Sequence, residues 1–208
     1  MRVAVGQHSF LALGDSYTIG EGVEPEGRWT HQLAAALRAE GIALDTPLTI
    51  ATTGWTTDEL QAGIAAAAPA GPYGLVSLLI GVNNQYRGLA LDDYAEQFRV
   101  LLAQAIRFAG GQAARVIVVS IPDWGVTPFA RQQSSDAAEV ARQIDAFNAA
   151  AEAICQAEGV AFVEITLASR EQGVDPAMLA DDGLHPSARM YAHWCERALP
   201  AARRALRD

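Results

Sequence analysis

Short apolar runs alternate with longer amphipathic segments along this chain. The runs are rich in Val, Ile and Leu and show little polar alternation, which is typical of strands buried on both faces. They read SFLALG (9–14), LTIAT (48–52), GLVSLLIG (74–81), RVIVVSI (115–121) and VAFVEI (160–165). Helical periodicity predicts helices over residues 29–39, 57–67, 91–108, 134–158 and 187–206. This alternation predicts an α/β protein with a parallel sheet and helices on both of its faces.

Residues at the predicted helix ends support these boundaries. Thr56 and Glu59 have the three-residue spacing of a capping box, which starts a helix. Gly110 and Gly111 end the helix predicted over 91–108. Pro200 lies inside the last predicted helix, where its ring and its missing N–H predict a kink or a break. No repeat or linker divides the 208 residues, so we expect one domain over residues 1–208.

Polar residues and glycines follow each of the first four predicted strands. In open parallel sheets, ligands bind outside the carboxyl ends of the strands. The residues at these ends are Asp15-Ser16, Thr53-Gly54, Asn83-Asn84 and Pro122-Asp123-Trp124. Gly14-Asp15-Ser16 alone is consistent with an ordinary turn and equally with a nucleophile presented at a strand end. A nucleophilic serine needs a base and an acid that orients the base, so partners elsewhere in the chain decide between the two.

His185 is the histidine best placed to act as that base. It lies in the loop-like stretch DGLHPS (182–187), directly before the last predicted helix. Asp182 precedes it by three residues, so a folded loop brings the carboxylate to Nδ1 and leaves Nε2 free to accept a proton. A surface turn is the alternative for this pair alone, but Ser16 upstream favours the catalytic interpretation. The other histidines are His8, at the opposite edge of the sheet, and His31 and His193, in predicted helices.

Composition and charge exclude several function classes. All 15 basic residues are arginine, and 24 acidic residues leave a net charge of −9, which argues against a nucleic-acid partner. The absence of lysine excludes Schiff-base chemistry, a Ser-Lys dyad and a phosphate-loop lysine. Cys155 and Cys195 match no metal or redox spacing and are expected to be buried thiols. We expect neither a cofactor nor a bound metal.

The apolar runs are too short for a membrane span, which needs about 18 or more consecutive apolar residues. The first residues, MRVAVGQHSFLALGDSY, contain only short apolar runs interrupted by Gln7 and His8, and no cleavage-like site follows them. A cytoplasmic location is therefore the default expectation.

Four short blocks occur in the order found in one enzyme family. They are GDSYT (14–18), the glycine of ATTGWTT (51–57), GVNNQYRG (81–88) and DGLHPS (182–187). In order and content these blocks resemble those of the SGNH hydrolases, the GDSL-type esterases and lipases, over nearly the whole chain. The resemblance implies a three-layer α/β/α, flavodoxin-like sandwich around a five-stranded parallel sheet.

The resemblance also implies roles for the residues of these blocks. Ser16 would be the nucleophile, His185 the general base and Asp182 the acid that orients the base. The oxyanion hole would consist of the backbone N–H groups of Ser16 and Gly54 and the side-chain amide of Asn83. Donors fixed before the reaction stabilise the developing negative charge, and a residue without Cβ lets its N–H approach the substrate closely.

Two positions depart from the family pattern. Tyr17 follows the serine in place of leucine, and Asn84 stands where the third block often has aspartate. Asn84 is therefore left out of the catalytic set and is expected to serve turn chemistry. Asp15 is expected to anchor the turn at the serine by accepting backbone N–H bonds.

A long polar connection, IPDWGVTPFARQQSSD (121–136), follows the fourth strand. Trp124, Pro128 and Phe129 in it are predicted to form an apolar wall for an acyl group, because loops on a rigid scaffold commonly carry specificity. The alternative is that the aromatic residues only cover the sheet edge. For Trp29 and Trp55 the two interpretations are equally good.

These observations predict a serine esterase that acts on a small-molecule acyl ester through an acyl-enzyme. A carbohydrate O-deacetylase or an acyltransferase shares this chemistry and stays open. A flavodoxin-like module that binds a nucleotide or another small molecule is a distant alternative, because neither GxGxxG nor a phosphate-loop lysine follows the first strand. The α/β-hydrolase fold is disfavoured because no GxSxG motif surrounds Ser16. A zinc amidohydrolase is disfavoured because His and Cys residues do not cluster as metal ligands would.

Overall fold

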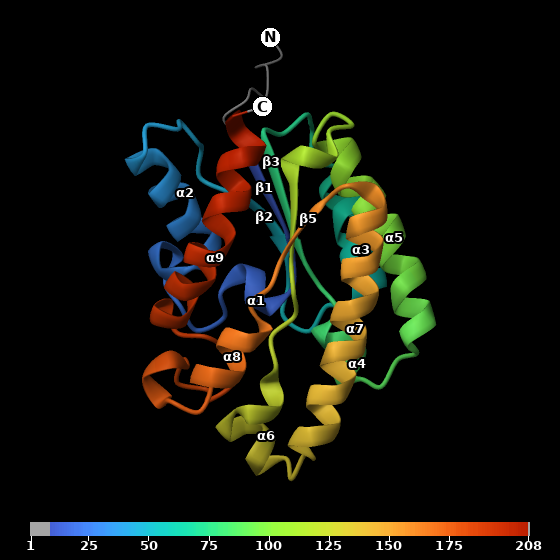
Figure 1. Ribbon diagram of the computed structural model, residues 1–208, viewed down its shortest axis with the longest axis vertical. Coiled ribbons are helices and arrows are strands. Elements are labelled where there is room, and N and C mark those ends of the chain that lie inside the picture. The colour runs from blue at the N-terminus through green and yellow to red at the C-terminus, as the bar shows by residue number, and fades with distance from the viewer. Residues whose placement is uncertain (1–8, 208) are drawn as a thin grey trace.

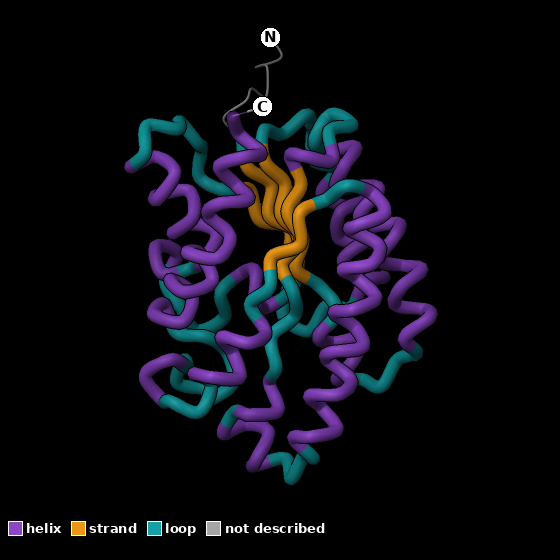
Figure 2. The backbone as a smooth tube through the Cα atoms, in the orientation of Figure 1, coloured by secondary structure: helices purple, strands orange, loops and turns teal. Residues whose placement is uncertain are grey.

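Five parallel strands form the central sheet of the structure, a computed structural model that describes residues 9–207 (Figure 1, Figure 2). The strands are β1 (Phe10–Gly14), β2 (Leu48–Ala51), β3 (Leu75–Leu79), β4 (Val116–Val119) and β5 (Ala161–Val163). Their order is β2-β1-β3-β4-β5, and every neighbouring pair is parallel. This is the flavodoxin-like order, so the predicted fold class is confirmed. His8 lies outside the described residues.

Helices cover both faces of the sheet and complete the three layers (Figure 1). One face carries α2 (Trp29–Ala39) and α9 (Ala188–Arg207), and the other carries α3 (Thr57–Ala67), α5 (Leu91–Phe108) and α7 (Ala137–Glu158). The short helices α1 (Ser16–Ile19), α4 (Val82–Tyr86), α6 (Pro128–Gln132) and α8 (Thr166–Gln172) lie beyond the carboxyl ends of the strands. Within residues 9–207, no helix is long and apolar enough to cross a membrane.

Burial explains why the predicted strands are so apolar. Every residue of β1, β3 and β4 is buried, as expected where helices cover both faces of a sheet. The edge strands β2 and β5 are less buried, and Leu48 of β2 keeps 49% of its surface exposed. The three central strands therefore form the rigid base on which the connections at their carboxyl ends are built.

The two cysteines belong to the packed helices of the outer layers. Cys155 of α7 and Cys195 of α9 are free and buried, as predicted. Burial raises the pKa of the Cys155 thiol to about 12 and that of the Cys195 thiol to about 11. Both side chains therefore stay protonated at neutral pH and act as small apolar groups.

Most helix ends follow the sequence signals. The capping box at the start of α3 is present, with the Thr56 N–H donating to Glu59 Oε2 over 2.9 Å. Gly111 N–H donates to the Ile106 carbonyl over 2.8 Å and ends α5. The helix predicted from residue 134 begins instead at Ala137, because the Asp136 side chain accepts hydrogen bonds from the first turn and caps it.

The last helix does not divide at Pro200. It continues from Ala188 to Arg207, although the proline cannot donate a backbone hydrogen bond. Ala198, Ala201 and Ala202 on either side of the proline are buried. Packing of this face against α2 and the sheet holds the helix together where its internal hydrogen bonding is interrupted.

The four short helices were not predicted from the sequence. They are four to seven residues long, too short to show a helical period in the sequence. Two of them follow β1 and β3 directly and carry Ser16 and Asn83. A third, α6, lies inside the long polar connection that follows β4.

Gly14, the last residue of β1, leaves no room for a side chain. A Cβ there would lie 2.1 Å from Thr18 Oγ1 and 2.4 Å from the carbonyl oxygen of Leu79 on the neighbouring strand. We expect Gly14→Ala to lower the free energy of unfolding by about 3 kcal/mol in urea denaturation, because the sheet backbone cannot move aside cheaply. Gly41→Ala is the control, since its φ of +83° is the only obstacle and nothing lies within 4 Å. It should lose about 1 kcal/mol, and equal losses in both variants would contradict the steric argument.

Candidate active site

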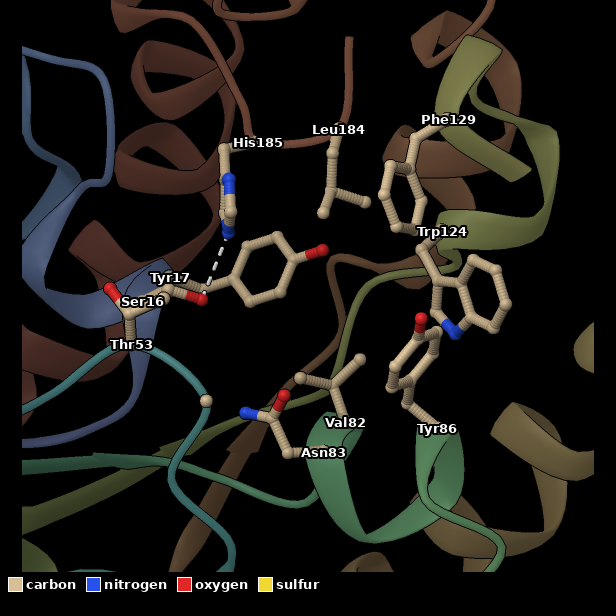
Figure 3. Close-up of a pocket in the computed structure, with 11 residues that line it drawn as sticks. Ser16, Tyr17, Thr53, Val82, Asn83, Tyr86, Trp124, Phe129, Leu184 and His185 are labelled. Atoms are coloured by element: carbon tan, nitrogen blue, oxygen red, sulfur yellow. Dashed lines mark hydrogen bonds between the residues drawn. The ribbon is translucent and has the colours of Figure 1, made fainter. Parts of the chain in front are cut away.

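The connections after β1, β2, β3 and β4 meet around one cavity of about 150 Å³ (Figure 3). Each of these connections contributes a predicted site residue, as the rule for open parallel sheets requires. The lining residues are Ser16, Tyr17, Thr53, Gly54, Val82, Asn83, Tyr86, Trp124, Phe129, Leu184 and His185. The structure therefore brings together polar groups that lie far apart in the sequence.

Ser16 is the first residue of α1 and is buried at the end of β1. Asp15 caps this helix, with its Oδ1 accepting a hydrogen bond from the Tyr17 N–H over 3.0 Å. The Asp15 carbonyl accepts from the N–H groups of Thr18 and Ile19. These bonds anchor the turn as predicted, so the Ser16 hydroxyl has a fixed position at the cavity.

His185 joins Ser16 to Asp182 through both nitrogens of its ring. Its Nε2 lies 2.9 Å from Ser16 Oγ, and its Nδ1 lies 2.5 Å from Asp182 Oδ2. The other carboxylate oxygen, Oδ1, accepts from the backbone N–H groups of Leu184 and His185 over 2.9 Å each. The loop thus folds back as expected from its three-residue spacing, and Figure 3 shows the ring directed at Ser16.

The charge of Asp182 determines which ring nitrogen carries the proton. Partial burial alone would raise the pKa of this carboxyl, but hydrogen bonds from the His185 ring and from two backbone N–H groups outweigh it and lower the pKa. An ionised carboxylate only accepts hydrogen bonds, so Nδ1 of His185 must donate. In the neutral ring, Nε2 is then the acceptor for the Ser16 hydroxyl.

Asn83 lies across the cavity from His185 (Figure 3), and Gly54 lines the same cavity. Asn83 Nδ2 donates one hydrogen bond to the Trp55 carbonyl over 2.9 Å, and the amide retains a second N–H. The backbone conformation of Gly54 gives a further reason for a glycine at this position. A Cβ there would have only Arg87 Nη2 nearby, at 3.7 Å, but the φ of +83° strongly favours glycine.

Aromatic side chains form the far wall of the cavity. Trp124 and Phe129 line it, and Tyr86 joins them from α4. The ring centroids of Tyr86 and Trp124 are 5.2 Å apart, and each lies within 6.4 Å of the Phe129 centroid. Pro128 is not among the lining residues; it begins α6 and lies against Gly183. Tyr86 was missed because α4 was not predicted, although it follows Asn83 by three residues on that helix.

Polar contacts on the side of Trp124 away from the cavity hold its ring in place. The indole Nε1 donates to Gln85 Oε1 over 2.7 Å, and Gln85 Nε2 donates to Gln143 Oε1 over 2.8 Å. The neighbouring Asp123 is buried and forms an ion pair with Arg170 at 2.8 Å. These contacts satisfy the buried indole N–H and fix the orientation of the ring.

The remaining candidates lie away from the cavity. Asn84 is buried within α4, so the expectation that it serves turn chemistry is wrong. Trp29 is buried at the start of α2, and the Trp55 ring packs against Gly63 of α3. His31 and His193 belong to α2 and α9. Among residues 9–207, no group of three or more His, Cys, Asp or Glu side chains is arranged to hold a metal ion.

The sequence and the fold resemble those of known ester hydrolases. The model of the GDSL-like Lipase/Acylhydrolase family matches residues 12–193. A search of curated proteins finds none that matches significantly. Among solved structures, that of TesA has 20% identity and a TM-score of 0.74, and the match covers 95% of this chain and 99% of that chain.

Two further structures share the fold. The psychrotrophic esterase EstA from Pseudoalteromonas sp. has 16% identity and a TM-score of 0.67, with 97% of this chain and 100% of that chain covered. The acetylxylan esterase Axe2 from Geobacillus stearothermophilus has 21% identity and a TM-score of 0.69, with 97% and 96% covered. At these identities the solved structures establish only a common fold. The relationship at the level of sequence rests on the match to the family model.

Asp15 is completely buried next to Ser16, and its Oδ2 has no hydrogen-bond partner among the described residues. Burial raises the pKa of this carboxyl from 3.8 to about 7, and the hydrogen bond from the Tyr17 N–H opposes the rise only in part. In the unfolded chain the group ionises near its ordinary pKa. Between these two values the folded state therefore holds a proton that the unfolded state has lost, and stability falls as pH rises.

We expect Asp15→Asn to remove this pH dependence, because asparagine does not titrate. From about pH 4 to about pH 7, the free energy of unfolding of the variant relative to wild type should rise by up to about 1.4 kcal/mol per pH unit. Urea denaturation at several pH values measures it. Asp175→Asn, at the exposed cap of a short helix turn, is the control. If the difference in unfolding free energy between Asp15→Asn and wild type stayed constant with pH, Asp15 would not be protonated in the folded state and the prediction would be wrong.

Proposed function

Because this chain belongs to the GDSL-like Lipase/Acylhydrolase family and is a carboxylic ester hydrolase, we propose that Ser16 is its nucleophile, with His185 as general base and Asp182 orienting it. The observation that carries the proposal is the continuous hydrogen-bonded chain through the His185 ring, at 2.9 Å to Ser16 and 2.5 Å to Asp182. Nε2 is the acceptor in this chain, which is the protonation state that a general base requires.

The reaction then proceeds in two acyl-transfer steps. Ser16 Oγ attacks the ester carbonyl carbon while its proton moves to His185 Nε2, and the carbonyl oxygen becomes an oxyanion. The imidazolium gives this proton to the leaving alcohol oxygen, the C–O bond breaks and an acyl-enzyme remains. Water attacks the acyl-enzyme with His185 again as base, and the acid is released as Ser16 regains its proton.

Three donors are proposed to stabilise the oxyanion: the backbone N–H groups of Ser16 and Gly54 and the second N–H of the Asn83 amide. They come from the connections after β1, β2 and β3, and all three residues line the same cavity. Donors held in place before the reaction need no reorganisation as charge develops, which makes such sites effective.

The acyl group of the substrate is proposed to lie between Val82 and Leu184, with its end against Trp124, Phe129 and Tyr86. This part of the cavity is mostly apolar and is lined by the three aromatic rings, which lie next to one another. Pro128 takes part only indirectly, by fixing the start of α6 and hence the position of Phe129. The apolar wall favours an ester with a short to medium hydrocarbon acyl group over an acetylated sugar.

Ser16→Ala tests the nucleophile. We expect it to lower kcat for p-nitrophenyl butyrate by at least about 10³-fold, because no covalent intermediate can form. The thermal unfolding midpoint should stay close to that of wild type. Ser135→Ala, a serine in the loop before α7, serves as the control and should keep full activity. If the Ser16 variant still turned over the ester at the wild-type rate, the mechanism would be wrong.

Phe129→Ala tests the acyl wall. We expect KM for a hexanoate ester to rise by about 10-fold and KM for the acetate ester to change little, since each methylene buried is worth about 0.8 kcal/mol. Phe108→Ala is the matched control, because it removes a partly buried phenylalanine at the end of α5, next to the segment that enters β3. Acetylated xylose and an alcohol acceptor in the same panel measure deacetylase and transferase activity. Equal effects of Phe129→Ala on acetate and hexanoate would place the acyl group elsewhere.

A further inference from the structure

The short helix α4 and the residue that caps it contact the Gly54 segment at several points. Asn83 donates to the Trp55 carbonyl over 2.9 Å, and Arg87 Nη2 donates to the Gly54 carbonyl over 2.5 Å. Asn84 forms two hydrogen bonds to Thr57, the first residue of α3. Two successive carbonyls of the loop after β2 are therefore held by side chains that follow β3.

The Asn84 contact is specific for an amide. The Thr57 N–H can only donate, so the atom 3.1 Å from it must be the amide oxygen of Asn84. The amide nitrogen then faces Thr57 Oγ1 at 2.7 Å and donates to it, and Thr57 Oγ1 in turn donates to Gln97. An ionised aspartate at this position only accepts, and it would compete with Gln97 for the Thr57 hydroxyl proton. Asn84 and Thr57 are both buried, so these bonds are shielded from water.

Arg87 is itself held in place from the α3 side. Its guanidinium contacts both oxygens of Glu59, at 3.2 Å and 3.3 Å, and Glu59 belongs to the capping box of α3. The side chains of Arg87 and Glu59 remain 45% and 40% exposed, and ion pairs this exposed add little to the stability of a fold. The pair with Glu59 instead orients the guanidinium, whose Nη2 donates to the Gly54 carbonyl.

Gly54 benefits from such support because glycine lacks the Cβ that restricts backbone rotation in other residues. Its φ is +83°, and only Arg87 Nη2 lies within 4 Å of the position that a Cβ would occupy. Anchoring the carbonyls of Gly54 and Trp55 fixes the two peptide planes that follow the Gly54 Cα, and so limits the backbone rotation at Gly54 that would turn its N–H away from the cavity. Because the anchors sit on the helix that carries Asn83, they also fix the position of one proposed donor relative to the other.

We propose that Arg87, together with Asn84, is a positioning residue for the oxyanion site. It holds the Gly54 N–H and the Asn83 amide at a fixed distance and orientation relative to each other. The proposal rests on the proposed function, since it assigns a purpose to the spacing of two donors named there. Neither residue is among those that line the cavity. Both act through the Gly54–Thr57 segment.

Arg87→Ala is the first test, on p-nitrophenyl butyrate. Removing an oxyanion donor costs about 10²–10³-fold in kcat, so loosening one donor should cost about 10-fold, with KM changed by less than about 3-fold. Arg87→Lys retains one cation for the Gly54 carbonyl and should recover part of the loss. Arg203→Ala is the matched control, because Arg203 is also a partly exposed arginine paired with a glutamate, Glu40, at the far end of α9. It should leave kcat unchanged.

An aryl boronic acid distinguishes positioning from a general structural effect. It adds to a serine nucleophile as a tetrahedral anion, so its inhibition constant reports on oxyanion stabilisation. We expect this constant to rise in Arg87→Ala by about the factor by which kcat falls, and to rise similarly in Asn84→Asp. A smaller fraction of folded enzyme would lower kcat and leave the inhibition constant unchanged, and that result would overturn the proposal.

The two proposals fail in different ways. If wild type showed no hydrolysis that depends on Ser16, the proposed function itself would fall. If hydrolysis depended on Ser16 but Arg87→Ala kept the wild-type kcat and inhibition constant, only the positioning role would be excluded.

Discussion

The parallel register of β1 with its two neighbours is the constraint on which the site depends. Gly14, the last residue of β1, pairs with Ala51 of β2 and with Leu79 of β3. The three strands therefore end level, and the chain leaves each of them at the same edge of the sheet. Gly14 has no room for a Cβ beside Leu79, so close packing of β1 on β3 is part of this register. A shift of one strand would separate Ser16 from the groups that follow β2 and β3.

Short connections convert this common edge into a rigid cavity. Ser16 and Asn83 sit on helices of four and five residues that start within a few residues of the strand ends. Side chains then join one connection to the next, as Asn83 and Arg87 do toward the Gly54 segment and Gln85 does toward Trp124. The walls of the cavity are therefore held in place both by the sheet on which they are built and by hydrogen bonds between neighbouring connections.

Two carboxyl groups near Ser16 have opposite properties because their surroundings differ. Asp15 is fully buried and keeps one oxygen without a partner among the described residues, so burial raises its pKa to about 7. Asp182 is partly exposed and accepts hydrogen bonds on both oxygens, which lower its pKa. Asp15 can thus serve as a structural cap that carries little charge below neutral pH, while Asp182 stays ionised and fixes the tautomer of His185.

Local patterns along the chain were enough to predict the fold class, the capping box at Thr56 and a small set of polar candidates, of which Ser16, Gly54, Asn83 and His185 line one cavity. Such features are visible because periodicity, caps and short motifs are written in neighbouring residues. Only the tertiary structure revealed Tyr86 in the aromatic wall, the bonds from Asn84 to Thr57 and the burial of Asp15. These depend on contacts between segments that are distant in sequence, and on helices too short to leave a periodic signal.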